Sequence, residues 1–317
     1  MNINYQNMRC KHRKFFSNEP QHIYQRTING FNIFYDIEDF LVFYTIFSLS
    51  AKKYNVTVYQ LCLMRDHVHS FIDVEHKKIM SDFICHHTST FVREYNRSIG
   101  RRGALFEKAY GNAPKRGDKK IRTTIPYIFN NPVEKHLCLR AEDYRWNFLA
   151  YAASDTPFSK QQNLMDSSKA LRRAFKEVRL CYEQGWYLNY RRIRRMFKGL
   201  SDKDKDRLTD YIIVTYSPFD YDYLISFYGN FETMLQAVNS VTGSEYDIKE
   251  TYYSHSDTIY DNFTAYVKAE GHETVRSVIM LPIEDKLALA RKLQDSTGAP
   301  VLQICKFLHI RPCPPTR

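Results

Sequence analysis

The chain has 317 residues, with 46 Lys and Arg against 35 Asp and Glu and a formal net charge of +11, and this length predicts two domains with separate cores. The positive charge favours a polyanionic partner, nucleic acid first and an anionic membrane surface second. Seven scattered cysteines without a CxxC pair argue against a zinc ribbon and a disulfide framework. No apolar run is long enough to cross a bilayer or to form a secretory signal behind the basic N-terminus, so we expect no membrane partner and a cytoplasmic location.

The first hundred residues alternate between strand and helix patterns. Residues 21–28 are β-branched and aromatic and precede an Asn-Gly turn, which predicts a strand. A helix is expected over 36–53, because acidic residues begin it, aromatic residues recur at spacings of three and four, and two lysines end it. Residues 56–64 and 67–74 are then expected to form a hairpin closed by Arg65 and Asp66.

Helix and strand patterns continue through the next fifty residues. A helix is predicted over 77–96, and "ALFEKAY" at 104–110 is predicted to be a short aromatic strand. A further helix is expected to end near "YIFNNP", because Pro132 disfavours a helical conformation for the residue before it. The order strand, helix, hairpin, helix, strand, helix predicts an α+β fold with one sheet and helices packed on one face.

A polar stretch at 154–169 divides this region from the rest of the chain. We therefore predict a first domain at 1–155, a basic helical connector at 156–200, and a mostly α-helical C-terminal domain at 201–317. Ten Lys or Arg against two Glu in 169–198 indicate either a solvated helix face or a phosphate-contacting surface. Residues 281–310 are expected to form two helices that resemble the start of a helix-turn-helix unit, although the prolines after them disfavour a third helix.

The stretch "LCLMRDHVHSFIDV" places His67 and His69 on either side of Val68 in a predicted strand. Alternate residues of a strand share a face, so both imidazoles point to one side and can converge on one cation. An isolated pair of this kind is more often made of ordinary hydrogen-bonding histidines. The pair alone therefore leaves both interpretations open.

Two later residues favour the metal interpretation. Tyr127 and Asn131 are four residues apart in a predicted helix and so lie one turn apart on the same face. Asn131 offers an amide oxygen as a third ligand for a hard divalent ion, and Tyr127 offers a phenol beside it. A phenol is a poor nucleophile at its ordinary pKa of about 10, and an adjacent metal ion would help by neutralising charge that develops on the electrophile.

These motifs resemble the single-tyrosine HUH transposases (His, bulky apolar residue, His), and most closely the REP-associated tyrosine transposases among the IS200-like transposases. The matching segments are "LCLMRDHVHSFI", "LFEKAY", "YIFNNPV" and "YRWNFLAY", in the expected order across the first half of the chain. The resemblance implies a ferredoxin-like antiparallel sheet for residues 1–155. It also implies cleavage of single-stranded DNA, with Tyr127 forming a 5′-phosphotyrosine link and releasing a 3′-hydroxyl.

The resemblance implies further roles and partners. His67, His69 and Asn131 would hold Mg²⁺ or Mn²⁺, no organic cofactor would be needed, and the substrate would be single-stranded or hairpin DNA bound by a monomer or a homodimer. The turn before the motif is usually Pro-Asn in such families, whereas this chain has Arg65 and Asp66. Pro126 is a second departure, because a proline inside a helix deletes a hydrogen bond, and a kink or a new turn is expected there.

A basic segment lies between the aromatic strand and the tyrosine helix. Its positive charges are expected to follow the DNA backbone beside the cleaved phosphate, with a solvated loop as the alternative. Arg65 could contact phosphate as well. The predicted DNA-binding residues are Arg65, Arg101, Arg102, Lys108, Lys115, Arg116, Lys119, Lys120 and Arg122. The sequence thus predicts a metal-dependent DNA transposase, and its alternative is a non-catalytic DNA-binding protein of the same fold that recognises repeat hairpins.

Overall fold

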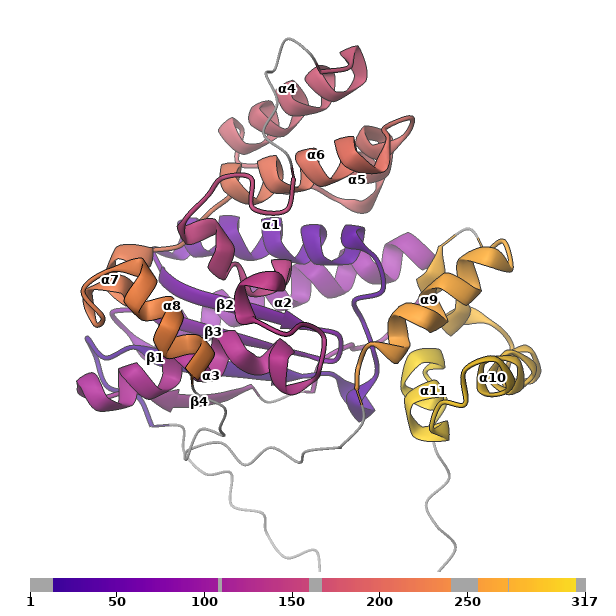
Figure 1. The fold of residues 1–317 in the computed structure, drawn as a ribbon, viewed down its shortest axis with the longest axis horizontal. Helices are drawn as coiled ribbons and strands as arrows, with labels where there is room; N and C mark the ends of the chain where they lie inside the picture. The colour runs from indigo at the N-terminus through magenta and orange to yellow at the C-terminus, as the bar shows by residue number, and fades with distance from the viewer. Residues whose placement is uncertain (1–13, 108–109, 160–166, 241–255, 273, 312–317) are drawn as a thin grey trace, which may run out of the picture.

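The computed structural model describes residues 14–107, 110–159, 167–240, 256–272 and 274–311. Its centre is an antiparallel sheet with the strand order β2-β3-β1-β4 (Figure 1). The strands are β1 (Gln21–Arg26), β2 (Thr57–Met64), β3 (His67–Asp73) and β4 (Gly111–Pro114). This is the ferredoxin-like order, which confirms the predicted fold class.

One face of the sheet is covered by α1 (Ile37–Tyr54) and α2 (Lys77–Ile99). Acidic residues in the first turn and lysines in the last turn of α1 complement the helix dipole. The C-cap of α2, Gly100, has a φ of +70°, a left-handed conformation that suits glycine. Inward-facing strand residues such as Leu61, Leu63 and Val68 pack against the phenylalanines of these helices and form the main core.

The opposite face of the sheet is covered by α3 (Asp118–Glu134). The intervening strand residues, Cys62, Met64 and Phe71, form a second apolar cluster with isoleucines of this helix. The two helices of the ferredoxin-like unit therefore share one face, as expected, and α3 lies on the other. The histidines of β3 face α3, because they alternate with core residues such as Val68.

The short aromatic strand predicted at 104–110 is not formed by the residues of this stretch that the structure describes, 104–107 and 110. Phe106 makes only an isolated bridge with Thr27, and the fourth strand of the sheet is β4, further along the chain. Phe106 is 4% exposed and belongs to the main core, so its apolar character reflects burial and not strand pairing. Gly111 begins β4 opposite Tyr24, and a Cβ at this position would overlap the Tyr24 ring.

The described residues after the sheet are mostly helical, as predicted, and lie in three places around the sheet (Figure 1). Residues 141–152 form three short 3₁₀ turns. The remaining elements are α4 (Lys169–Glu183), α5 (Tyr190–Phe197) and α6 (Asp202–Thr215) beyond α1; α7 (Tyr221–Ser226) and α8 (Phe231–Ser240) beside α3; and α9 (Ile259–Ala269), η6 (Val275–Met280), α10 (Ile283–Thr297) and α11 (Val301–Leu308) at the end of the sheet. No helix among the described residues is long and apolar enough to span a membrane.

The predicted pair of C-terminal helices is confirmed as α10 and α11. Two apolar residues of this pair, Leu287 and Val301, are 47% and 58% exposed. Leu293 and Phe307 are fully buried residues of the pair, and Phe307 packs on Tyr35 of the first domain. The proposed domain boundaries stay a prediction, since one continuous core includes side chains from all three predicted segments.

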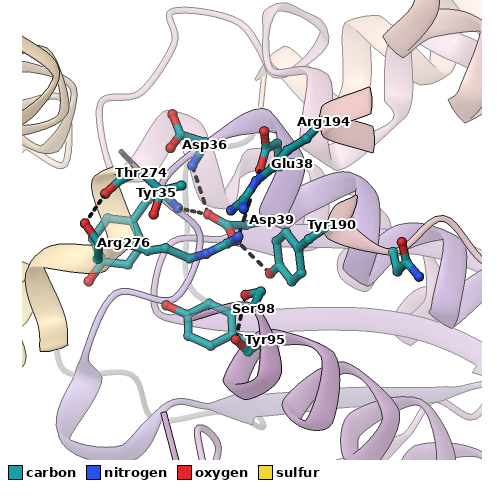
Figure 2. Close-up of polar contacts among 12 residues, drawn as sticks. Tyr35, Asp36, Glu38, Asp39, Tyr95, Ser98, Tyr190, Arg194, Thr274 and Arg276 are labelled. Atoms are coloured by element: carbon teal, nitrogen blue, oxygen red, sulfur yellow. Dashed lines mark hydrogen bonds and ion pairs between the residues drawn. The ribbon is translucent and has the colours of Figure 1, made fainter. Parts of the chain in front are cut away.

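A buried polar cluster ties these segments together at the start of α1 (Figure 2). Asp39 accepts hydrogen bonds from the Tyr190 hydroxyl at 2.9 Å and from the backbone N–H groups of Tyr35 at 2.9 Å and Asp36 at 3.0 Å. It also forms an ion pair with Arg276, whose guanidinium lies 3.5 Å from the centroid of the Tyr190 ring. We call these residues the Asp39–Arg276 cluster. It joins α1 to α5 and to η6.

Candidate active site

The structure brings together the four residues predicted to carry the chemistry. His67 and His69 project from one face of β3, and their ring centroids are 5.0 Å apart. Tyr127 and Asn131 lie one turn apart on α3, which crosses this face. Asn131 Oδ1 is 3.4 Å from His67 Nε2, and the Tyr127 ring centroid is 5.8 Å from that of His69.

Asp66 orients the His67 ring from the turn before β3. Its Oδ1 is 2.6 Å from His67 Nδ1. Burial alone would raise the pKa of Asp66, but the adjacent His67 and the positive charge of Lys306 lower it below its usual range, so this carboxylate is ionised. An ionised carboxylate only accepts hydrogen bonds, and His67 Nδ1 therefore carries the proton. This leaves His67 Nε2 facing Asn131.

Hydrogen bonding also fixes the orientation of the Asn131 amide. Its Nδ2 donates to the Tyr127 carbonyl at 2.9 Å, so its oxygen points to His67 Nε2. A neutral imidazole nitrogen and a carbonyl oxygen are both acceptors, and two acceptors facing each other call for a positive charge. Either a second proton on His67 or a cation held between the two atoms satisfies this arrangement.

His22 is a site residue that the sequence interpretation missed. Its Nε2 is 2.9 Å from His69 Nδ1, and both side chains are fully buried. Burial lowers the pKa of His69 well below its ordinary value, and the neighbouring His67 and His22 add to the effect, so His69 is neutral at pH 7. The sequence did contain a sign of this role, because the alternation of side chains in "QHIYQR" puts His22 on the face of the strand opposite the buried Ile23. Only the pairing of β1 with β3 brings it to His69.

The donor set fits a hard or borderline divalent ion. No group of three His, Cys, Asp or Glu side chains suited to a metal occurs in the described part of the chain, so a site here depends on the amide of Asn131. Two neutral imidazole nitrogens and an amide oxygen are normal ligands, and each histidine has a partner on its other nitrogen, Asp66 for His67 and His22 for His69. Such partners fix the tautomer and the orientation of ligating imidazoles.

The tyrosine helix does not break at its prolines. The predicted new turn at Pro126 is wrong, because α3 is one helix that contains both Pro126 and Pro132, and the predicted kink stays a prediction. Pro126 has no N–H for the carbonyl of Arg122, four residues earlier, and the Tyr228 hydroxyl donates to this carbonyl at 3.0 Å instead. Tyr228 lies between α7 and α8, so the C-terminal half supports the tyrosine helix directly.

The site lies below the surface. His67 is 9% exposed, Tyr127 3%, Asn131 2% and His69 0%. The His67 side is thus the more open one, and a ligand reaches it first. Near the start of α3, a hollow of about 540 Å³ is lined by residues that include Lys119, Arg122 and Pro126, directly before Tyr127 in the sequence.

The predicted DNA-binding residues are placed in three different settings. Exposed basic residues, which remain candidates, are Arg102, Arg116, Lys119, Lys120 and Arg122. Arg101 is half-buried and donates to Asn96 and to its own loop. Arg65 and Lys115 are only 8% and 1% exposed, and Arg65 pairs with Asp261, so we leave both out of the proposed DNA surface. Lys108 lies outside the described residues.

A ferredoxin-like sheet with a histidine pair on a central strand and a tyrosine helix across it defines the class of HUH folds. Within this class, residues 17–131 match the family model described as "Transposase IS200 like". The family implies a transposase that acts on DNA. No curated protein and no solved structure has significant similarity to the chain.

Proposed function

We propose that the protein cleaves and rejoins single-stranded DNA at hairpin-forming repeats through a covalent 5′-phosphotyrosine intermediate. One observation carries the proposal. Tyr127 lies across the buried histidine pair of β3, with the oxygen of Asn131 turned toward His67 one helical turn later. The family of residues 17–131 supports the transposase part of the proposal, and the geometry of these side chains supports the chemistry.

In the proposed reaction, Tyr127 Oη attacks the scissile phosphorus. A phosphorus–oxygen bond to tyrosine forms as the bond to the 3′ oxygen breaks. The phenol gives up a proton and the departing oxygen takes one up, so the products are a phosphotyrosine and a 3′-hydroxyl. Because one phosphodiester replaces another, no ATP is required. Attack by a 3′-hydroxyl on the phosphotyrosine reverses these changes and rejoins the strand.

His67 Nε2, His69 and Asn131 Oδ1 would hold Mg²⁺ or Mn²⁺ beside the phosphate. The ion would polarise the phosphoryl oxygens and neutralise charge that develops during attack. Asp66 keeps the proton on His67 Nδ1, and His22 provides the corresponding partner for His69. Imidazole ligands favour Mn²⁺ over Mg²⁺ in affinity.

The exposed cations beside α3 are proposed to hold the DNA strand. Lys119 and Arg122 line the hollow before Tyr127, and Arg116 is 63% exposed near it in the sequence. Contacts of this kind neutralise phosphates without reading bases, so they add affinity that falls with salt. The proposed function is compatible with a monomer and with a homodimer.

The alternative function is a non-catalytic protein that binds repeat hairpins, and the burial of Tyr127 favours it. A phenol that is 3% exposed must become accessible before it can attack a phosphate. The two functions differ in one product, the covalent adduct, which only the enzyme forms.

The test uses labelled single-stranded DNA carrying a hairpin, incubated with the protein and Mn²⁺. We expect a covalent protein–DNA adduct that Tyr127→Phe abolishes and that the control Tyr59→Phe retains, because Tyr59 is a buried tyrosine on β2 that stacks on Tyr223. Binding without an adduct under Mg²⁺ and Mn²⁺ alike would establish the alternative function.

A second variant separates chemistry from binding. His67→Ala is expected to abolish cleavage while leaving most of the DNA affinity, because the ion serves the chemistry and the exposed cations serve binding. The matched control is His86→Ala, which removes a helix histidine that bonds to Ser50. Fluorescence anisotropy gives the affinity and gel analysis gives cleavage. An equal loss of both in His67→Ala would show that the roles are wrongly assigned.

A further inference from the structure

We infer that the C-terminal helix α11 supplies a positioning residue to the active site, Lys306, which acts on His67 through the carboxylate of Asp66. The inference rests on the proposed function, in which His67 is a metal ligand. It assigns a role in catalysis to a part of the chain outside the segment that matches the transposase family. It also explains why the turn before the histidines is built from two charged residues.

One carboxylate connects the two side chains. Asp66 Oδ1 is 2.6 Å from His67 Nδ1, and Asp66 Oδ2 is 3.5 Å from Lys306 Nζ. Lys306 and Asp66 are 20% and 22% exposed, so solvent screens their attraction only in part. With one oxygen held by each partner, the carboxylate has a single orientation. That orientation presents a fixed acceptor to His67 and aims its Nε2 at Asn131.

Lys306 stands on a helix that is itself held against the first domain. The Lys306 carbonyl accepts from the backbone N–H of Asn32 at 3.2 Å, and the next carbonyl, that of Phe307, accepts from the Tyr35 hydroxyl at 2.6 Å. His309 Nε2 donates to the Asn32 carbonyl at 2.6 Å. The lysine therefore approaches Asp66 from a fixed base, as positioning of a ligand requires.

Gly30 leaves room for the lysine to pass. Its φ is +63°, which favours glycine, and a Cβ there would lie 3.3 Å from Lys306 Cε and 3.7 Å from Asp66 Oδ2. Such contacts are tight for the lysine side chain. The absence of a side chain at residue 30 therefore leaves space for the Lys306 side chain to reach Asp66.

The other residue of the turn is held by the C-terminal part in the same way. Arg65 forms an ion pair with Asp261 of α9, and it donates to the Phe34 carbonyl at 3.3 Å. Both charged residues that replace the usual Pro-Asn turn therefore have a partner beyond residue 255. The turn that sets the position of His67 is therefore held from two sides, by the side-chain partners of the C-terminal helices and by backbone hydrogen bonds from residues 27–34 of the first domain.

The functional consequence concerns the metal ion more than the DNA. A partner that orients a ligating histidine typically changes metal affinity or activity by about 10–100-fold. Lys306 lies on α11 and is not one of the exposed cations near α3 that we assign to DNA binding. Loss of its charge should therefore weaken metal use and leave DNA affinity in place.

The test compares Lys306→Met, which keeps length without charge, with Lys306→Arg, which keeps the charge. The control is Lys292→Met, which removes a lysine of α10 whose ion pair with Glu270 is exposed. We expect Lys306→Met to raise the Mn²⁺ concentration for half-maximal cleavage by about 10–100-fold. DNA affinity in the presence of a chelator and the melting temperature should change little. Lys306→Arg and the control should behave like the unmodified chain.

A second measurement does not depend on cleavage. The imidazole nitrogen resonances of His67 in the metal-free protein report which ring nitrogen carries the proton. We expect Lys306→Met to shift or broaden them and Lys292→Met to leave them unchanged. If the unmodified chain forms no DNA adduct, the proposed function fails, but these resonances still decide whether Lys306 orients His67.

Two results would overturn the inference. One is unchanged Mn²⁺ dependence together with unchanged His67 resonances in Lys306→Met. The other is an equal defect in Lys306→Arg, because the charge would then not be what matters. Lys306→Gln serves as the second uncharged variant if Lys306→Met does not fold, and the same two outcomes apply to it.

Discussion

Two buried polar clusters of this protein are built by opposite rules. In the Asp39–Arg276 cluster a carboxylate meets a guanidinium, a phenol and two backbone N–H groups, so its charge is neutralised within the protein, although Arg276 Nε and Nη2 have no hydrogen-bond partner (Figure 2). In the candidate site, an imidazole nitrogen of His67 and the oxygen of Asn131 face each other as acceptors. The first arrangement joins elements, whereas the second is suited to holding a cation.

The difference teaches how to separate structural from functional polar burial. Buried charged groups cost free energy unless they are paired, and a cluster whose opposite charges pair within the protein needs no ligand. A cluster whose atoms call for a positive charge acquires its full stability only with a ligand. Removal of one residue should therefore destabilise the first cluster strongly, and should affect chemistry more than stability in the second.

The largest effect on stability is expected from Asp39→Ala. It leaves the guanidinium of Arg276, which is 2% exposed, with only the more distant carboxylate of Glu38 at 3.9 Å, and loss of one partner from a buried ion pair typically costs about 3–5 kcal/mol. Urea unfolding gives the free energy. The control is Lys268→Met, which breaks the ion pair with Asp36 in which the lysine is 58% exposed, and about 1 kcal/mol or less is expected there. Equal costs for the two variants would break the comparison.

A smaller effect on the free energy of unfolding is expected at low pH from His309, which helps to hold α11 in place. Burial lowers the pKa of His309 to about 4, and the hydrogen bond to the Asn32 carbonyl only partly opposes this. Its unfolded pKa is about 6.5, so the unfolded chain binds the proton more tightly and stability is lost as the pH falls from 6.5 toward 4. From pH 7 to pH 5 this histidine alone should cost about 2 kcal/mol.

His309→Gln isolates this contribution, since glutamine keeps an N–H donor but does not titrate. The difference in unfolding free energy between pH 7 and pH 5 should be smaller by about 2 kcal/mol in this variant. The comparison is needed because His87, whose pKa burial lowers to about 3, changes stability in the same direction. An unchanged pH dependence in His309→Gln would contradict the prediction.

The smallest effect concerns the support of the tyrosine helix. Tyr228→Phe removes the donor to the Arg122 carbonyl and should cost about 1 kcal/mol, the usual net value of one hydrogen bond. In a Pro126→Ala background, the restored N–H of residue 126 can bond to the same carbonyl, so the cost should shrink. A double-mutant cycle of unfolding free energies measures this coupling. Independent effects of the two substitutions would mean that Tyr228 does not compensate for the proline.

The local periodicities predicted much of the fold and the candidate site. The alternation of side chains in β3 put His67 and His69 on one face of the sheet. The helical repeat of α3 put Tyr127 and Asn131 on one face of that helix. These relations depend on neighbours two or four residues apart, so they are properties of the sequence. The fourth strand was misplaced because Phe106 is buried as a core residue without pairing as a strand.

The remaining features depended on contacts between distant segments. His22 reaches His69 only through the register of β1 with β3, and Tyr228 supports α3 across about a hundred residues of chain, on the scale of a whole domain. The burial of Arg65 and Lys115, both predicted to bind DNA, was equally invisible to a count of charges. The sequence shows which residues carry a positive charge, but tertiary packing decides which of them are exposed to solvent.

The sequence by itself thus determined the strand and helix pattern, the histidine pair and the tyrosine with its asparagine, because each follows from short-range geometry. Only the tertiary structure decided which groups complete their surroundings. The carboxylate of Asp66 gains its second partner from Lys306, 240 residues later, because α11 packs against the loop before α1. No periodicity specifies such a contact, since it arises from the docking of one folded segment on another.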